Sequence, residues 1–322
     1  MNYFLQLALL GNRVFASLPF AIEFDGQIDR VTNSLQVPVF MGTDSEVTRF
    51  ANFDMSSRHI TVLPNEATHG RSISLGPGRL VGSGEVGSMS LYPASTGIGV
   101  SLRRKIGANF ASVFANTVGK MMMVPTDTRE SVRVIVGPFE AYEYCVDPIV
   151  TIPATFTNPG DGDNAMVYVS ISVMDSVTEE ELSLPTEPEL FRIDAYFDTD
   201  TVPRAVLNDL RGIFDHRFGL HLYAETNLEI AGACEHIIDR LPALKYSIMD
   251  QSGQYNLIDV ILQPRDYIKV DVHTCPIQLQ DNTLESDLPE PDTRNILGMN
   301  FLRQVAVLFD YRNNQFGFCE PN

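Results

Sequence analysis

The amino-acid sequence predicts an all-β fold. Its apolar runs are short, rich in β-branched residues and interrupted at close intervals by Gly, Pro, Asn and Asp. The clearest runs are Val132–Val136, Met166–Val173 and Leu257–Leu262. With 322 residues, of which 44% are hydrophobic, the chain is long enough for a large core and for about two domains.

Helical signals are few. The strongest covers Pro203–Phe214, where a proline suits the first turn and apolar residues recur at helical spacing behind it. A second helix is expected over Gly99–Phe114. Asn158–Asn164 and Leu284–Thr293 have the composition of exposed loops, and the acidic run Glu179–Glu189 is expected to be solvated surface.

The net charge of −18 limits the classes of partner. A surface this acidic repels phosphate backbones, so we expect no nucleic-acid partner. No run approaches the ~18 apolar residues of a membrane span. The sequence also lacks the Gly-x-Ser-x-Gly elbow of serine hydrolases and a phosphate-binding loop.

The first 16 residues have the pattern of a signal peptide. An apolar stretch is followed by Val14-Phe15-Ala16, with a small residue at the expected cleavage site, although no basic residue precedes the stretch. This predicts secretion or delivery to an endomembrane or vacuolar lumen. The alternative interpretation is a buried first strand.

Four cysteines, Cys145, Cys234, Cys275 and Cys319, allow three disulfide pairings. A different interpretation is a zinc site, because Cys234-x-His236 and His273-x-Cys275 together supply two thiols and two imidazoles. Their spacing is tighter than structural zinc sites usually have.

A pattern of apolar residues ending in Asp occurs twice. The first is Phe53-Asp54-Met55-Ser56-Ser57, between the strand-like segments 37–53 and 60–64. The second is Ala195-Tyr196-Phe197-Asp198-Thr199-Asp200-Thr201, which runs into the predicted helix. Two carboxylates held close together cannot both ionise, so one acts as a base and the other as an acid.

The C-terminal segment 295–318 adds the most specific pattern. It contains Ile296-Leu297-Gly298, then Phe301-Leu302-Arg303, then a predicted hairpin that ends in Gly317-Phe318. Together with the two Asp loops, these blocks resemble the pepsin-like family of aspartic proteases. The resemblance covers residues 37–65 and 132–322 well and is thin between 83 and 131.

The resemblance implies a bilobal, all-β fold with a six-stranded base sheet shared by both lobes. An N-terminal lobe would span 17–147 and a C-terminal lobe 148–322, with Ile296–Gly298 passing beneath the second Asp loop. It implies a peptide or protein in the interlobe cleft, a monomer, and no cofactor or metal. The implied catalytic pair is Asp54 and Asp198, and the implied supporting residues are Ser57, Thr199 and Thr201.

The resemblance also implies a Cys234–Cys275 disulfide. Cys145 and Cys319 then pair or stay free, and we favour pairing because both lie at the ends of elements expected to meet in the base sheet.

The family pattern is broken at positions that bear on chemistry. Met55 replaces a Thr and Ser56 a Gly in the first loop, and Asp200 replaces the Gly of the second. The predicted flap hairpin over Ile73–Gly82 would contact substrate through Ser74, Leu75 and Gly76, with Leu75 where the family has a Tyr. The first lobe's Ile-Leu-Gly-Leu element is best approximated by Gly87–Pro93.

Two hypotheses follow from the resemblance. The substitutions favour a weak or inactive pseudo-protease that binds peptide or protein without cutting it. Retention of Asp54 and Asp198 favours an acid endopeptidase that hydrolyses peptide bonds through a water held by both carboxylates. Positioning errors of about 1 Å cost about 100-fold in rate, which makes the first hypothesis the stronger one.

Overall fold

The protein is described here by a computed structural model. It describes residues 21–28, 35–41, 48–54, 60–62, 72–75, 80–83, 85–86, 97–99, 119–126, 131–156, 165–195, 197, 199–223, 228–231, 234–270, 273–282 and 295–322. These residues form mostly strands, so the predicted all-β class is confirmed. No helix in the described ranges is long and apolar enough to cross a membrane.

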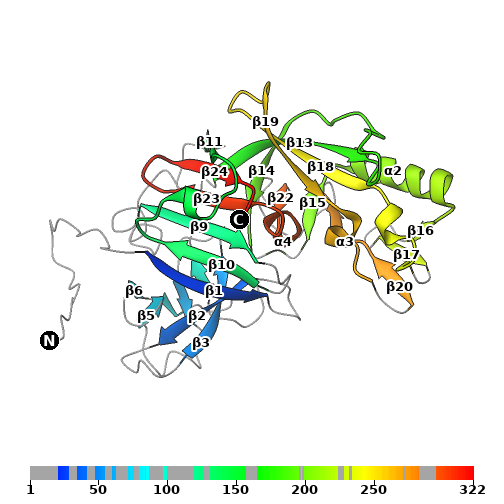
Figure 1. The fold of residues 1–322 in the computed structure, drawn as a ribbon. Helices are drawn as coiled ribbons and strands as arrows, with labels where there is room; N and C mark the ends of the chain where they lie inside the picture. Colours follow the sequence, from blue (N-terminus) through cyan, green and yellow to red (C-terminus); the bar gives the residue numbers. More distant parts are fainter. Residues whose placement is uncertain are drawn as a thin grey trace, which may run out of the picture.

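Six strands from the beginning, middle and end of the chain form a common base sheet. Its order is β11-β24-β23-β9-β10-β1, as Figure 1 shows. The middle pair, β23 with β9, is antiparallel, with Leu308 opposite Met122. Each half of the sheet therefore repeats the other, and the predicted shared base sheet is confirmed. The strands are β1 (Ile22–Ile28), β9 (Lys120–Pro125), β10 (Ser131–Val136), β11 (Val150–Pro153), β23 (Ala306–Asp310) and β24 (Gln315–Cys319).

The N-terminal strands extend this sheet beyond β1. They follow in the order β2-β3-β8-β4-β7, and the hairpin of β5 and β6 attaches to β2. Figure 1 shows β2, β3, β5 and β6 below β1. The strands are β2 (Leu35–Met41), β3 (Thr48–Asp54), β4 (Ile60–Val62), β5 (Ser72–Leu75), β6 (Leu80–Ser83), β7 (Glu85–Val86) and β8 (Gly97–Gly99).

The C-terminal lobe is built around a second sheet. Its order in the described residues is β19-β18-β13-β14-β22, with β12 attached to β13. Two smaller sheets, β15-β21 and β16-β17-β20, complete it. The strands are β12 (Thr155–Phe156), β13 (Ala165–Met174), β14 (Glu189–Ile193), β15 (Asp200–Val202), β16 (Leu222–Tyr223), β17 (Glu229–Ala231), β18 (Ala243–Met249), β19 (Asn256–Leu262), β20 (Thr274–Pro276), β21 (Leu279–Asp281) and β22 (Ile296–Leu297).

The predicted helix behind the second Asp loop is present as α2 (Arg204–Ile213), which Pro203 precedes. Its Val206, Leu207 and Leu210 are buried, as the helical spacing predicts. Of the expected helix over Gly99–Phe114, Gly99 ends β8 and the remainder lies outside the described residues. The other helical elements are η3 (Ala141–Glu143), a π-helical turn η4 (Phe214–Phe218), η5 (Ile238–Arg240), α3 (Pro264–Tyr267) and α4 (Met299–Leu302).

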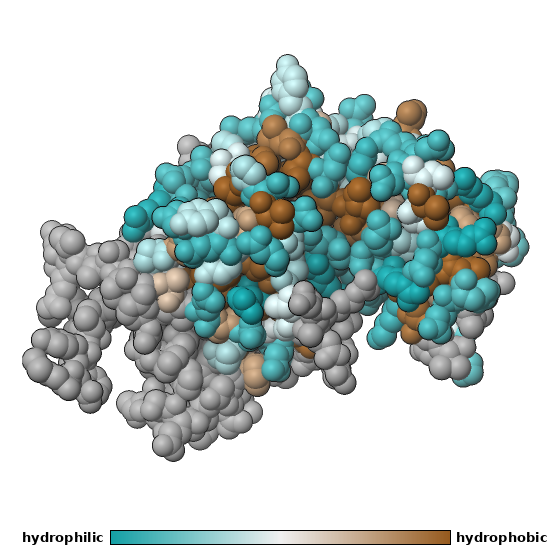
Figure 2. All heavy atoms as spheres, in the orientation of Figure 1, coloured by the Kyte–Doolittle hydropathy of each residue, from teal (hydrophilic) through white to brown (hydrophobic). Residues whose placement is uncertain are grey.

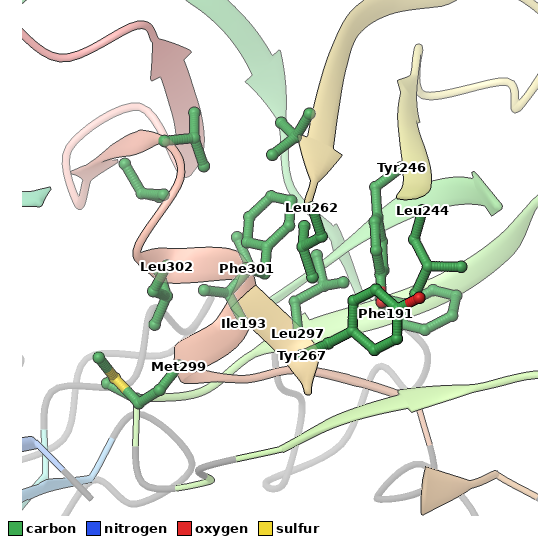
Figure 3. Close-up of a cluster of buried hydrophobic side chains, with 14 of the residues drawn as sticks. Phe191, Ile193, Leu244, Tyr246, Leu262, Tyr267, Leu297, Met299, Phe301 and Leu302 are labelled. Atoms are coloured by element: carbon green, nitrogen blue, oxygen red, sulfur yellow. The ribbon is translucent and has the colours of Figure 1, made fainter. Parts of the chain in front are cut away.

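A continuous apolar core joins the base sheet to the second lobe. In the second lobe, Ile193 of β14, Leu297 of β22 and Phe301 of α4 belong to one buried cluster (Figure 3). The methionines at 121–123 are buried and fill core space. Burial of β14, β22 and α4 in this cluster fixes the second Asp loop from below.

Both disulfides are formed. Cys234–Cys275 confirms the pairing that the resemblance implies and engages both thiols that the zinc alternative requires. Cys145–Cys319 ties the chain before β11 to the last strand of the base sheet, as we favoured from the sequence.

On the face shown in Figure 2, the described surface is mainly hydrophilic, with groups of hydrophobic residues among the hydrophilic ones. Glu179, Glu180 and Glu181 are exposed, which confirms the prediction of solvated surface for this acidic segment. The predicted loops Asn158–Asn164 and Leu284–Thr293 lie outside the described residues.

Candidate functional site

Asp54 is the last residue of β3, which pairs in parallel with β8. The register places Phe53 opposite Ile98 and Asp54 opposite Gly99. The sequence prediction for this supporting element, Gly87–Pro93, was therefore wrong: the segment that runs beside β3 is Gly97–Gly99. Its Ile98-Gly99 has the order, an apolar residue followed by Gly, that is expected of this element. Met55, Ser56 and Ser57 lie outside the described residues.

The predicted flap is a hairpin. β5 pairs with β6 in antiparallel fashion, with Leu75 opposite Leu80 and Ile73 opposite Gly82. β5 also pairs with β2, which places Leu75 opposite Val39. The strands confirm the hairpin over Ile73–Gly82, and Ser74 and Leu75 lie near its turn. Gly76, at the turn itself, is outside the described residues.

In the second lobe, β14 leads into the Asp loop and pairs in parallel with β22. Arg192 lies opposite Ile296 and Ile193 opposite Leu297. The pairing continues one residue further, because the Asp194 amide donates to the Leu297 carbonyl over 2.9 Å. Asp198 itself lies outside the described residues, so its role as second catalytic carboxylate stays a prediction.

The residues on either side of Asp198 lie against Gly298. The amide of Met299 donates to the carbonyl of Phe197 over 2.8 Å. A Cβ atom on Gly298 would stand 2.7 Å from that same carbonyl oxygen, and closer still to the carbonyl of Thr199. Only glycine permits this approach. The prediction that Ile296–Gly298 passes beneath the second loop is therefore confirmed.

Asp200 is fully buried at the start of β15. Its Oδ1 accepts hydrogen bonds from the amides of Gly298, over 2.6 Å, and Phe301, over 3.4 Å. The carboxylate therefore caps the first turn of α4. Burial raises the pKa of Asp200 to about 7, although these two amide donors lower it in part.

Thr201, a predicted supporting residue, fixes β15 to β22. The Ile296 amide donates to its hydroxyl over 2.6 Å. Thr199 is partly exposed, and its carbonyl lies against Gly298. The side chains of Asp200 and Thr201 thus bond to the backbone of Ile296, Gly298 and Phe301 beneath the loop.

A buried ion pair lies at the entrance of the second loop, and sequence reasoning missed it. The Arg192 guanidinium is 3.0 Å from Asp194 Oδ2, and the two side chains are 4% and 0% exposed. The same guanidinium lies 5.8 Å from the centre of the Phe197 ring, a cation–π distance. The available signal was two opposite charges two residues apart at the end of a strand, because alternate residues of a strand share a face.

Among the described residues, no group of three or more His, Cys, Asp or Glu side chains is arranged to hold a metal. The described part of the site contains carboxylates, a guanidinium and backbone amides.

No protein-family model and no curated protein matches the sequence. Solved structures do match the fold. An aspartic proteinase from Irpex lacteus superposes with a TM-score of 0.63 at 15% sequence identity, covering 94% of this chain and 98% of that one. Basic 7S globulin from soybean superposes with a TM-score of 0.63 at 10% identity, covering 93% and 96%.

These matches extend over nearly the whole chain, so the protein has the pepsin-like aspartic proteinase fold that the sequence resemblance predicts. One of the two proteins is named as a proteinase and the other as a globulin. The fold alone therefore leaves hydrolysis open, and the decision rests with the residues of the two loops.

Proposed function

We propose that this protein binds a peptide or protein segment in the cleft between its lobes and hydrolyses peptide bonds weakly or not at all. The observation that carries this proposal is the chain that leaves β3 at Asp54: it continues Met55-Ser56, without the Thr and Gly that a working loop has at these places.

Each substitution removes a group with a physical task. A threonine hydroxyl would bond across the lobe interface and hold the carboxylates coplanar, and a methionine thioether supplies no donor for it. A glycine would let the backbone turn tightly under the carboxylate, and a Cβ atom restricts that turn. At Leu75 the flap lacks a phenolic hydroxyl. Losses of this kind accumulate because an acid–base pair tolerates little displacement.

The alternative is an active acid endopeptidase in which Asp54 and Asp198 hold the attacking water. Retention of an Asp at both predicted positions and the fold of a proteinase support it. In that case the two carboxylates would share one proton at acidic pH.

The setting that we propose is extracellular or lumenal. Two disulfides are typical of an oxidising compartment, and they agree with a signal peptide over residues 1–16. We further propose a monomer with lobes spanning 17–147 and 148–322, no cofactor and no nucleic-acid partner.

The purified protein tests these alternatives directly. It is incubated with acid-denatured globular protein at about pH 4, with and without pepstatin, and the fragments are identified by mass spectrometry. Asp54→Asn is the matched control. We expect no fragments beyond those of the control, together with a shift in melting temperature when pepstatin, or peptides prepared from the same substrate protein with another protease, bind. Cleavage that pepstatin blocks and Asp54→Asn abolishes would overturn the proposal, and so would the absence of any peptide binding.

A further inference from the structure

The two lobes contain parallel strand pairs with the same register relative to a carboxylate. In the first lobe, Asp54 lies opposite Gly99, the residue that ends β8. In the second, Ile193 lies opposite Leu297 and the next residue, Asp194, therefore lies opposite Gly298. Asp198 stands four residues beyond that position in the chain.

The strands that follow the two loops give the same alignment. β4 begins at Ile60, six residues after Asp54, and β15 begins at Asp200, six residues after Asp194. The second residue of each strand is a threonine that lies beside the residue two positions before Gly99 or Gly298. Thr61 pairs with Gly97, and the Thr201 hydroxyl accepts a hydrogen bond from the amide of Ile296. Counted from Asp198, β15 would begin after only two residues and neither correspondence would exist.

A direct contact brings the loop of Asp194 to the strands of the first lobe. The amide of Leu35, at the start of β2, donates to the carbonyl of Ala195 over 3.0 Å. β2 pairs with β3 with Gln36 opposite Asn52, so the same antiparallel register brings Leu35 to the level of Phe53. Neighbouring strands are about 5 Å apart. Ala195 and Phe53, the residues next to Asp194 and Asp54 in the chain, therefore each lie about one strand spacing from Leu35.

From these correspondences we propose that Asp194, and not Asp198, is the second-lobe counterpart of Asp54, and that Arg192 holds it in a buried ion pair. This inference rests on the proposed function and deepens it. Read from Asp194, the second loop is Asp-Ala-Tyr-Phe, which lacks a threonine and a glycine as the first loop does.

The ion pair explains why such a site would not perform acid–base catalysis. In a working pair one carboxylate is protonated and the ionised one accepts a proton from the attacking water. A guanidinium 3.0 Å from Asp194 stabilises its ionised form, so Asp194 is a poor acceptor for that proton, and Arg cannot give up its own proton. Arg192 is thus a positioning residue that holds Asp194 ionised with a fixed positive charge.

The position of Asp194 is tested by introducing cysteine pairs into the full-length chain. All four native cysteines are in disulfides, so introduced thiols react selectively. Asp54→Cys is combined with Asp194→Cys in one variant and with Asp198→Cys in the other. Both are oxidised with copper phenanthroline, and the linked peptides are identified by mass spectrometry. A disulfide requires Cα atoms within about 7 Å.

We expect the 54–194 disulfide to form and the 54–198 pair to remain reduced. The reverse result would overturn the assignment, as would the absence of both links when the native disulfides are intact. A parallel pair of variants carries Arg192→Met, so that the Asp194→Cys substitution does not leave a buried guanidinium without its carboxylate and the chain still folds.

The role of Arg192 needs a measurement that a purely structural residue would not change. Carbon-13 NMR of the Asp194 carboxyl is followed from neutral to acidic pH in the wild type, Arg192→Lys and Arg192→Met. We expect Asp194 to take up its proton at a higher pH in Arg192→Met and near the wild-type pH in Arg192→Lys. Identical titrations in all three would refute the role of the charge.

Neither measurement depends on activity. If the 54–194 link forms in the cysteine variant and the wild-type protein cleaves peptides, the proposed function is overturned and the assignment of Asp194 stands. If the 54–198 link forms instead and the wild type is inactive, the proposed function is supported and the assignment is wrong.

Discussion

Replacing Asp200 with Asn should make the stability of the protein much less dependent on pH. The carboxyl is fully buried, and burial raises its pKa from 3.8 to about 7. Because the folded pKa exceeds the unfolded one, the stability associated with protonated Asp200 is fully present below pH 3.8 and is lost as the pH rises through about 7. The interval between the two values corresponds to about 4 kcal/mol at alkaline pH, as an upper bound.

Asn keeps the acceptor oxygen that receives the amides of Gly298 and Phe301, and it carries no charge at any pH. We therefore expect Asp200→Asn to match the wild type near pH 4 and to exceed its stability at pH 8 by up to about 4 kcal/mol. The assay is urea unfolding followed by fluorescence at a series of pH values.

Asp250→Asn is the matched control, because the Ser252 hydroxyl and backbone amides of its turn lower the pKa of Asp250. Its contribution has the opposite sign: it is present at neutral pH and is lost in acid. If Asp200→Asn and the wild type had parallel stability curves, or if their difference grew towards acidic pH, the assignment of a buried carboxyl with a raised pKa would be refuted.

Three further predictions concern the frame of the site. Arg192→Met should lower the free energy of unfolding by about 3–5 kcal/mol, because it leaves Asp194 buried without its cation. The double variant Arg192→Met with Asp194→Leu should be close to the wild type in stability. Equal losses in both variants would contradict a coupled pair. Gly298→Ala should destabilise the protein by about 1–3 kcal/mol or more, because the added Cβ clashes with the carbonyls of Phe197 and Thr199. The control Gly212→Ala has open space around it in α2 and should stabilise the protein by about 0.5–1 kcal/mol. Thermal unfolding of the two variants distinguishes these outcomes. Replacing both cysteines of a disulfide with serine should cost about 4 kcal/mol for Cys234–Cys275 and about 5 kcal/mol for Cys145–Cys319 on the loop-entropy model, and a larger loss for the shorter loop would count against that model here.

Much of the frame follows from local sequence patterns. The apolar run at 166–173 predicts a strand because it is long and β-branched, and β13 covers it. Helix α2 follows from a proline ahead of an apolar face of helical period. The hairpin of β5 and β6 was visible as two short apolar runs around a Gly-Pro-Gly turn. Each of these signals lies within a few residues of the element it predicts.

The placement of the second carboxylate could not be read in this way. A motif of Asp-Thr at 198–199 is a stronger sequence signal than Asp-Ala at 194–195, so pattern matching selects Asp198. The register of β14 against β22 is a pairing between residues about 100 positions apart, and it points to Asp194. The same limit applies to the first lobe, where the parallel partner of β3 proved to be Gly97–Gly99. Three-residue strands rich in glycine have little local signal.

The ion pair was missed for a related reason. An isolated Arg or Asp in a sequence is most often a surface residue, and burial of both is recognisable only once the strand is known to lie inside the second lobe. Asp200 shows the same effect: at the sequence level it is a third acidic residue beside the loop, and in the structure its carboxylate caps α4.

A crystal structure of the full-length protein at acidic pH provides the most direct test of the central claim, through the distances from the Asp54 carboxylate to those of Asp194 and Asp198. We predict that Asp194 is the nearer of the two, that Arg192 remains ion-paired with it, and that no water is shared symmetrically by two carboxylates. A water held between Asp54 and Asp198, with Asp194 turned away from both, would contradict the account and restore the interpretation of a working acid endopeptidase.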